Sequence, residues 1–320
     1  MDGRVRRDTM KTLSIIVPCY NEQETVDLFY DAVEKIKPQI ADMVELEYIF
    51  VNDGSKDDTL NKLRSLQQRD TEQVHYVSFA RNFGKEAALY AGLQKATGDY
   101  VVVMDADLQD PPEMLVEMCD ILETSPEYDA VGTRRTDRKG EPPIRSFFSN
   151  MFYKLINKIS DTEMLDGVRD YRMMRRQMVD AILELTEVNR FSKGIFSWVG
   201  FNTKYLPYEN VERVAGETSW SFWSLLKYSI EGIVNFSEFP LSLATYVGGF
   251  SCVAAFFGII WIFVAKLLGH PSADGWASII CILLLLGGIQ LFCLGIVGKY
   301  IAKIFSETKK RPIYIVKEEK

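Results

Sequence analysis

The sequence has few residues of the kinds that bind zinc or act as histidine bases. Its 320 residues include two histidines, His75 and His270, and five cysteines that form no Cys-x-x-Cys pair. Structural zinc sites are assembled from histidine and cysteine, and an odd number of cysteines does not suit a disulfide framework. The composition therefore argues against a zinc domain, a histidine-based hydrolase and a disulfide-rich scaffold.

Several nucleotide- and metal-binding motifs are also missing. The sequence contains no Gly-x-Gly-x-x-Gly string and no His-Glu-x-x-His string. Gly84-Lys85 is followed by Glu86 rather than Ser or Thr, and it lacks the earlier glycine of a P-loop. A net charge of −7 disfavours nucleic acid as the main partner. With 47% hydrophobic and 12% aromatic residues, the chain is not a disordered one.

Two stretches near the C-terminal end lack charged residues altogether, at 243–265 and 277–298. At about 1.5 Å per residue each would form a helix about 33–35 Å long, enough to cross a hydrocarbon core of about 30 Å. A pair of helices buried in a soluble core is the alternative, but uninterrupted apolar runs of this length favour membrane spans. Both stretches lie too late in the chain for a signal peptide.

The charges that flank these stretches predict an orientation. The connection 266–276 carries one basic and one acidic residue, whereas 299–320 carries seven basic and three acidic residues. The positive-inside rule places this basic tail in the cytoplasm, and two crossings return the N-terminal part to the same side. We therefore expect a multi-pass protein of the cell membrane, the inner or plasma membrane, with its N-terminal domain and both termini in the cytoplasm.

Between the N-terminal part and the first span, the apolar residues of 220–242 recur at three- and four-residue steps. This spacing predicts an amphipathic helix in the headgroup plane, with a helix packed on the soluble domain as the alternative. The predicted division of the chain is a cytoplasmic domain, a juxtamembrane helix, a two-helix transmembrane domain and a cytoplasmic basic tail, at 1–219, 220–242, 243–299 and 300–320.

In the N-terminal part, short apolar runs rich in β-branched residues alternate with helix-like segments. The predicted strands are 13–17, 48–51, 75–79 and 100–104. The predicted helices are 22–37, 57–69, 85–96 and 113–123. This alternation is typical of an α/β domain with a mostly parallel sheet. Such sheets bind ligands at the carboxyl ends of their strands.

Polar residues stand at two of these strand ends. Asp105 and Asp107 follow the fourth predicted strand, and because they are two residues apart they face the same side of an extended chain, as does Gln109. Carboxylate and amide oxygens are ligands suited to Mg²⁺ or Mn²⁺. Exposed acidic loops also produce Asp-x-Asp strings, and Asp53 lies in an Asn-Asp-Gly-Ser string that also forms ordinary turns.

Taken together, four strings resemble those of family 2 glycosyltransferases with the GT-A fold: IIVPCYNE, VNDGSKDDT, ARNFGKEAAL and MDADLQDPP. Others resemble the branch that includes dolichol-phosphate mannose synthases and bactoprenol glucosyltransferases: VGTRR, RSFFS, VRDYRMMRR, NRFSKG and RVAGETSWS. The first nine residues match nothing, so Met1 and Met10 are both candidate starts. The resemblance implies a Rossmann-like GT-A catalytic domain, followed by an interfacial helix and two transmembrane helices.

The resemblance also implies roles for individual residues. The donor nucleotide would be bound by Pro18, Tyr20, Glu22, Asp53, Lys85, Asp105 and Arg213. The metal would be held by Asp105, Asp107 and Gln109, and the acceptor phosphate by Arg134, Arg145 and Ser149. Three positions depart from the common pattern of the family: Arg169 replaces a glycine, Ser219 a lysine and Asn210 an arginine.

Asp170 matches the acidic residue of the Gly-Asp-Phe-Arg-like string of the family and is the candidate catalytic residue. A phosphate acceptor has a second pKa of about 6, so it is largely dianionic near neutrality and needs positioning more than deprotonation. A base helps only if the phosphate binds as the monoanion, and a carboxylate would repel the dianion. Asp170 is therefore either a base or the group that orients Arg172 or the sugar.

The implied activity is transfer of a hexose from a nucleotide sugar, UDP-glucose or a related UDP-hexose, to undecaprenyl or another polyprenyl phosphate. The reaction would be metal-dependent and inverting, and its product would serve the modification of cell-envelope glycans. The expected partners are the nucleotide sugar, the lipid, the membrane and further copies of the chain in a homo-oligomer. Two alternatives are a processive polysaccharide synthase, which typically has more spans and a Gln-x-x-Arg-Trp string, and a non-catalytic membrane subunit that binds sugar nucleotides.

Overall fold

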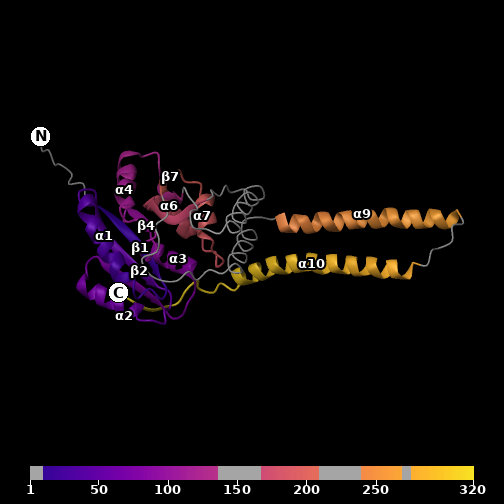
Figure 1. Cartoon of the computed structure of the whole chain (residues 1–320), viewed down its shortest axis with the longest axis horizontal. Coiled ribbons are helices and arrows are strands. Elements are labelled where there is room, and N and C mark those ends of the chain that lie inside the picture. The colour runs from indigo at the N-terminus through magenta and orange to yellow at the C-terminus, as the bar shows by residue number, and fades with distance from the viewer. Residues whose placement is uncertain (1–9, 136–166, 209–238, 269–274) are drawn as a thin grey trace.

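The computed structural model describes residues 10–135, 167–208, 239–268 and 275–320, and its N-terminal part is built on one eight-stranded sheet (Figure 1). The strands lie in the order β7-β5-β6-β4-β1-β2-β3-β8. Their bounds are β1 Lys11–Cys19, β2 Val44–Asn52, β3 Val74–Phe79, β4 Tyr100–Val103, β5 Ala130–Arg135, β6 Val168–Arg175, β7 Thr203–Tyr208 and β8 Val316–Glu319.

The four strands at the centre of the sheet are parallel. β1 pairs with β2 on one side and with β4 on the other, and β2 pairs with β3. The chain therefore builds outward from β1 in two directions, and the strand order reverses between β1 and β4. In open α/β sheets ligands bind at such a switch point, outside the carboxyl ends of the strands. Here these ends are Cys19 and Val103.

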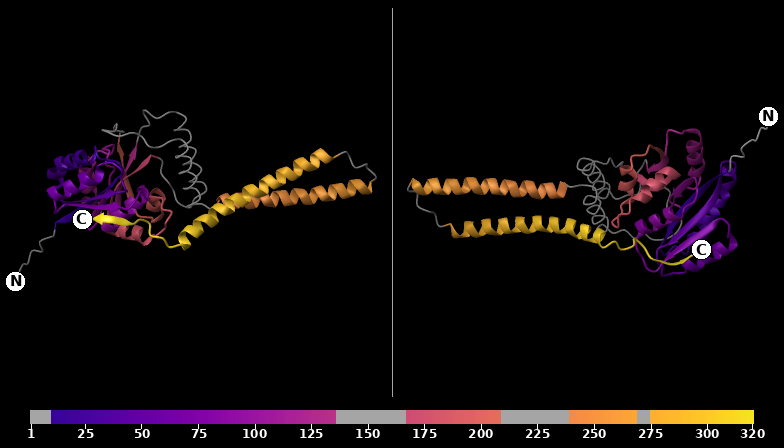
Figure 2. Two further views of the ribbon diagram at one scale, coloured as in Figure 1. Left: turned by 90° about the horizontal axis from the view of Figure 1, so that it is seen from below. Right: turned by 180° about the vertical axis from the view of Figure 1, so that it is seen from behind.

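Helices cover both faces of the sheet, as Figures 1 and 2 show. Along β1 the buried side chains alternate, so that Leu13, Ile15 and Val17 belong to one core cluster and Ile16 belongs to the other. Strands buried on both faces read as continuous apolar runs. The first cluster includes side chains of α1 Val26–Ile40, α2 Thr59–Arg69 and α4 Met114–Thr124, and the second those of α3 Lys85–Lys95, α6 Arg176–Glu184 and α7 Ser192–Trp198.

The predicted fold class and the four predicted strand–helix pairs are confirmed. The bounds differ most for the first helix, which begins at Val26 rather than at Glu22. The four residues before it form a turn, in which the backbone N–H and the hydroxyl of Thr25 donate to the Glu22 carbonyl at 3.1 and 3.2 Å. The turn places Glu22 in the loop at the switch point rather than on a helix.

Strands β5, β6, β7 and β8 were not predicted. β6 runs antiparallel to both β4 and β5, so it extends the sheet away from the parallel centre. β8 lies in the segment assigned to the basic tail, and it pairs antiparallel with β3, with Glu319 opposite Val77. Charged residues are typical of edge strands, and for that reason β8 gives no hydrophobic pattern. The last residues of the chain thus belong to the sheet of the N-terminal domain.

Two long helices form the other part of the molecule, α9 Phe239–Leu267 and α10 Trp276–Thr308. Both are long and apolar enough to cross a membrane. Their large apolar side chains are exposed, including Tyr246 at 75%, Phe250 at 77% and Trp261 at 76%. Exposed apolar surface of this extent is typical of contact with lipid rather than with water. Most of the predicted juxtamembrane helix 220–242 lies outside the described residues, and its last four residues open α9.

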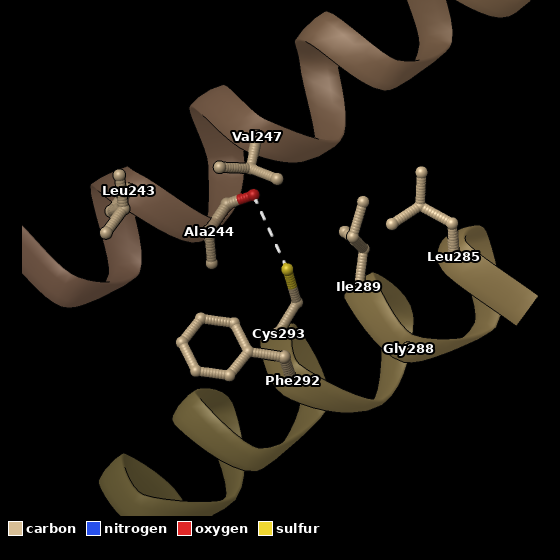
Figure 3. Close-up of a pocket in the computed structure, with 8 residues that line it drawn as sticks. All are labelled: Leu243, Ala244, Val247, Leu285, Gly288, Ile289, Phe292 and Cys293. Carbon is tan, nitrogen blue, oxygen red and sulfur yellow. Dashed lines mark hydrogen bonds between the residues drawn. The ribbon is translucent and has the colours of Figure 1, made fainter.

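The two helices run side by side, and residues of both line an open pocket of about 350 Å³ (Figure 3). The Cys293 thiol faces the Ala244 carbonyl across it at 3.8 Å. Gly288 has no side chain and leaves space here, because among the described residues no heavy atom outside its own helix backbone lies within 4 Å of where its Cβ would be. The lining is apolar throughout and consists of Leu243, Ala244, Val247, Leu285, Gly288, Ile289, Phe292 and Cys293.

Candidate active site

The loops that follow β1 and β2 are tied to each other by hydrogen bonds. The backbone N–H of Asn21 donates to the Ser55 hydroxyl, and the Asn21 side chain accepts from the backbone N–H of Lys56, both at 2.9 Å. The backbone N–H of Glu22 donates to the Thr59 hydroxyl at 2.9 Å. Asn21 has a φ of 57°, a left-handed conformation that non-glycine residues rarely adopt. The two loops therefore form one fixed shelf beside the switch point.

Asp53 holds a third loop against this shelf. Its carboxylate is 3% exposed and accepts from the backbone N–H groups of Phe83 and Gly84 at 2.6 and 2.9 Å. Burial raises the pKa of Asp53, although these two bonds oppose the shift. Gly54 makes the approach possible, because it has a φ of 64° and its Cβ would lie 2.3 Å from the carbonyl carbon of Arg81. Whether Asp53 also contacts a nucleoside stays a prediction.

The loop held by Asp53 leads directly into α3, whose first residue is Lys85. The Lys85 ammonium group lies between two carboxylates, 2.8 Å from Asp105 and 2.9 Å from Asp170. Burial lowers the pKa of Lys85, but the two carboxylates outweigh it and hold that pKa above its ordinary value. The structure thus brings together three predicted site residues from α3, from the end of β4 and from β6.

The Asp170 carboxylate accepts from Lys85, and the described part of the chain shows no hydrogen bond or ion pair between Asp170 and its predicted partner Arg172. Burial raises the pKa of Asp170, but Lys85, Lys193 and Arg169 outweigh it and hold the pKa well below its ordinary value. A carboxyl group in this setting is ionised near neutrality and is a weak base. The geometry therefore favours a positioning role, in which Asp170 orients Lys85.

The predicted metal ligands lie in the loop that follows β4. Asp107 is 8% exposed and accepts from the Gln109 backbone N–H at 3.1 Å, and Leu108 between them has a φ of 55°. Backbone strain of this kind costs of the order of 1–3 kcal/mol and is concentrated at functional sites. The conformation directs Asp107 inward and leaves Gln109 half-buried beside β6.

Arg169, the departure from the family pattern, contacts this same loop. Its guanidinium donates to the Gln109 side-chain carbonyl at 3.3 Å and lies 3.6 Å from the carboxylate of Asp110. Burial raises the pKa of Asp110 to about 6, and Arg169 opposes that shift. Tyr208 donates to Asp110 at 3.1 Å. Sequence reasoning missed these partners, and the arginine in place of glycine was the one available signal.

The donor set fits a divalent cation in its chemistry. Two of the three predicted ligands already accept from a cationic side chain, Asp105 from Lys85 and Gln109 from Arg169. The side chain of Asp105 is 29% exposed, so a ligand can reach it from solvent. Within the described residues no three His, Cys, Asp or Glu side chains gather to hold a metal. A metal here would therefore be held by two carboxylates and an amide, with its other ligands from the substrate.

Arg172 is buried behind Asp170 on the same face of β6. It is 2% exposed, and its guanidinium lies 4.7 Å from the ring centre of Phe196 and 5.8 Å from that of Tyr205. Within the described segments, its Nε and Nη1 atoms have no hydrogen-bond partner. Burial lowers the pKa of Arg172. The stacking on two aromatic rings offsets part of the cost of burying this charge.

The remaining predicted residues are more scattered. Pro18 lies within β1 opposite Val51, and Tyr20 is 43% exposed at the end of that strand. The Glu22 carboxylate accepts from the Thr25 hydroxyl at 2.6 Å. The predicted acceptor residue Arg134 is exposed near the end of β5. Three predicted residues lie outside the described part of the chain, namely Arg145, Ser149 and Arg213.

The mostly parallel sheet carries a charged cluster at its switch point, and the sequence model of glycosyl transferase family 2 matches residues 14–183. The chain belongs to this family. Its relatives include the bactoprenol glucosyl transferase of Shigella phage SfV, at 40% identity over 311 residues that cover 96% of this chain and 99% of that one. A homologue of this transferase from an Escherichia coli prophage is 39% identical over 96% of this chain and 99% of its own.

A Bacillus subtilis protein, CsbB, whose glycosyltransferase name is provisional, is 46% identical over 306 residues, which cover 96% of this chain and 91% of its own. These three matches extend over nearly the whole chain. Among solved structures, glucosyl-3-phosphoglycerate synthase from Mycobacterium tuberculosis covers 70% of this chain and 77% of its own, with a TM-score of 0.44 and 19% identity. This last similarity is too distant to inform the site.

Proposed function

We propose that this protein transfers a hexose from a nucleotide sugar to a polyprenyl phosphate at the membrane surface, with UDP-glucose as the first donor to test. One observation carries the proposal: the Lys85–Asp105–Asp170 cluster lies at the switch point of a glycosyltransferase domain in a chain that also has two helices apolar enough to cross a membrane. The names of the relatives, which include bactoprenol glucosyl transferases aligned over nearly their full length, support glucose and a polyprenyl carrier.

On the donor side, the shelf formed by the loops after β1 and β2 would hold the nucleoside. Asp105, Asp107 and Gln109 would hold Mg²⁺ or Mn²⁺, which supplies neutralisation of the charge that develops on the leaving diphosphate. Lys85 stands beside Asp105, so its ammonium group can donate to the same diphosphate. Asp170 keeps Lys85 oriented toward this position.

On the acceptor side, the nucleophile is an oxygen of the lipid phosphate, which is already ionised near neutrality. An ionised Asp170 with a depressed pKa agrees with a reaction that needs no general base. Arg134, together with Arg145 and Ser149, would position the phosphate, because the planar guanidinium matches phosphate geometry. A single displacement at the sugar C1 then inverts the anomeric centre.

The arrangement of the chain supports one orientation in the membrane. β8 follows both apolar helices and pairs with β3 of the catalytic domain, so the two parts share one side of the bilayer. The bases that follow the second helix favour the cytoplasmic side. We infer that the catalytic domain and the C-terminal strand are cytoplasmic in a multi-pass protein of the cell membrane. Homo-oligomer formation stays a prediction, which native mass spectrometry of the purified protein would test.

The test is a transfer assay with purified full-length protein, undecaprenyl phosphate and a panel of UDP- and GDP-sugars, with Mg²⁺ or Mn²⁺. Mass spectrometry of the lipid fraction should show the acceptor enlarged by one hexose, and Asp105→Asn should abolish the product. Polymeric sugar in the product would favour a processive synthase instead. Nucleotide-sugar binding without transfer from any donor would favour a non-catalytic subunit.

A further inference from the structure

The helix α10 extends well beyond the apolar stretch that predicted it. The uncharged run ends at Gly298, but the helix continues to Thr308. Ten further residues add about 15 Å at the rise of an α-helix. Figure 1 shows that this end of α10 faces the catalytic domain, while its other end lies with the far end of α9. One continuous helix therefore runs from the uncharged stretch 277–298 to the domain.

The last turn of α10 contacts the loop between α6 and α7. The carboxylate of Glu307 accepts from the backbone N–H of Val188 at 3.0 and 3.1 Å and from that of Asn189 at 3.2 Å. The side-chain amide of Asn189 adds a longer bond at 3.4 Å. Hydrogen bonds from N–H groups to a carboxylate are stronger than neutral ones. Glu307 thus connects the end of α10 to the loop between α6 and α7.

The contacted loop is itself fixed to the first turn of α3, where Lys85 stands. The backbone N–H of Ser192 donates to Glu86 at 2.9 Å, and the Ser192 hydroxyl donates to the same carboxylate. Arg190 is 8% exposed and lies over the ring of Tyr90, 4.3 Å from its centre. The end of the loop, where α7 begins, is thus bonded to the start of α3, and a displacement of the loop would act on these bonds.

The chain after α10 makes a second attachment at the edge of the sheet. The Tyr314 ring stacks on Phe79, with 4.8 Å between ring centres, and its hydroxyl donates to Gln94 at 2.7 Å. The backbone N–H of Ala80 donates to the Ile315 carbonyl at 2.9 Å. β8 then pairs with β3. Two attachments at separate points fix a rotation as well as a distance, which a single attachment cannot do.

We propose that Glu307 is a positioning residue that sets the orientation of the catalytic domain over the membrane, so that the Lys85 cluster meets a phosphate carried by a bilayer lipid. The inference rests on the proposed function for its substrate. The acceptor phosphate is confined to the surface plane of the bilayer, so the domain must present its site at one height and tilt. A helix that continues out of the membrane and bonds to a loop next to the site meets this requirement.

The inference predicts a separation between two kinds of acceptor. In full-length Glu307→Ala placed in lipid nanodiscs, kcat/KM for undecaprenyl phosphate in the bilayer should fall about five- to tenfold, because small misplacements of reacting groups are costly. With a short, water-soluble prenyl phosphate, which reaches the site from solution, the same variant should stay within about twofold of wild type. The dissociation constant for the nucleotide sugar should not change. Glu307→Gln, which keeps one carbonyl acceptor, should restore part of the loss.

Glu184→Ala is the matched control, because Glu184 is an exposed carboxylate at the end of α6 for which the described part of the chain shows no hydrogen bond or ion pair. It should behave as wild type with both acceptors. Equal losses with the bilayer-held and the soluble acceptor would overturn the proposal, as would no loss with either. Wild-type protein that transfers sugar to neither acceptor would contradict the proposed function instead.

Hydrogen exchange provides a readout that does not depend on turnover. The amides of Val188 and Asn189 should exchange faster in Glu307→Ala than in wild type, since their acceptor is removed. Unchanged exchange at both amides would show that the contact does not hold the loop, and would overturn the proposal whatever the enzyme's substrate.

Discussion

The catalytic domain and the helical hairpin use the same apolar residue types in opposite ways. Ile49 in β2 is 1% exposed, whereas Leu291 in α10 is 71% exposed. In the domain, apolar side chains are hidden from water between sheet and helices. In the hairpin they face outward, which costs nothing where the surroundings are lipid. Short apolar runs therefore mark side chains that pack inside a soluble domain, whereas uncharged runs long enough to cross a bilayer mark side chains that face lipid.

Transfer should depend on the charged groups of the catalytic domain and not on side chains within the apolar stretches of the hairpin. Asp105→Asn removes a charge from the metal and Lys85 contacts, and we expect transfer to fall by at least about 10²-fold, because metal stabilisation of a leaving group is worth several kcal/mol. Gln290→Leu in the hairpin should leave transfer near wild type. Incorporation of labelled sugar into lipid measures both. Normal turnover of Asp105→Asn would contradict the proposed metal site.

Truncation to alanine should separate the two regions by stability. Ile49→Ala empties part of the core and should destabilise the domain by about 2–5 kcal/mol. Leu291→Ala exposes no cavity to water and should change the midpoint of thermal unfolding little. Leu291→Lys, in contrast, should hinder membrane insertion by about 2.5–3.5 kcal/mol. Unfolding in detergent and extraction of membranes at alkaline pH measure these effects. Equal effects of the two alanine variants would contradict the lipid-facing assignment.

Asp170→Asn should distinguish a role of Asp170 in positioning Lys85 from a role as general base. We expect about a tenfold loss of kcat/KM, because Lys85 loses one of its two carboxylate partners. The shape of the rate profile between pH 5 and 8 should be the same in variant and wild type, because the pKa of Asp170 is depressed far below this range. If the wild-type rate fell at low pH and the rate of the variant did not, Asp170 would be assigned the role of general base instead.

The smallest effect is expected at the junction of the two regions. Hydrogen bonds from Arg64 and Tyr76 hold the pKa of Glu318 in β8 at about 2, below its ordinary 4.5. A depressed pKa stabilises the fold above the ordinary value, and this contribution is lost as the pH falls through the folded-state value. Protection of the Tyr76 and Lys320 amides against exchange should therefore persist to about pH 4.5 and decline toward pH 2.

Glu318→Gln should show slightly reduced protection of these two amides already at neutral pH. The effect should be small, because Glu318 and Arg64 are partly exposed and such pairs contribute little. The pairing of Lys95 with Glu319 should be unaffected and serves as the internal control. Identical protection across the whole pH range in wild type would show that backbone pairing alone holds β8.

The sequence predicted those parts of the molecule whose pattern is local. The four parallel strands are apolar runs between helix-like segments, and the two candidate spans are long runs without charge, so each could be recognised by itself. Strand β6 mixes arginines, an aspartate and methionines, and β8 is mostly charged. Neither has the alternation that marks a strand, because β8 lies at an edge and β6 carries site residues.

The candidate site likewise has a part that is local in sequence and a part that is formed by contacts between distant residues. The spacing of Asp105, Asp107 and Gln109 was visible within one short string. The contact of Lys85 with Asp170 joins residues 85 positions apart, and that of Arg169 with Gln109 joins residues 60 positions apart. Pairings of this kind depend on which strands become neighbours, and the antiparallel insertion of β6 beside β4 was not predictable from local pattern.

The pairing of β8 with β3 also has a consequence for biogenesis. In the proposed orientation, β3 is made early in synthesis, and its outer edge has no partner until the chain has crossed the bilayer twice and come back. A hairpin inserted with the wrong number of crossings would deliver β8 to the opposite compartment, and an unpaired edge is prone to aggregate. With this topology, completion of the sheet would depend on correct insertion of the membrane segment, and misinserted copies would keep an open strand edge.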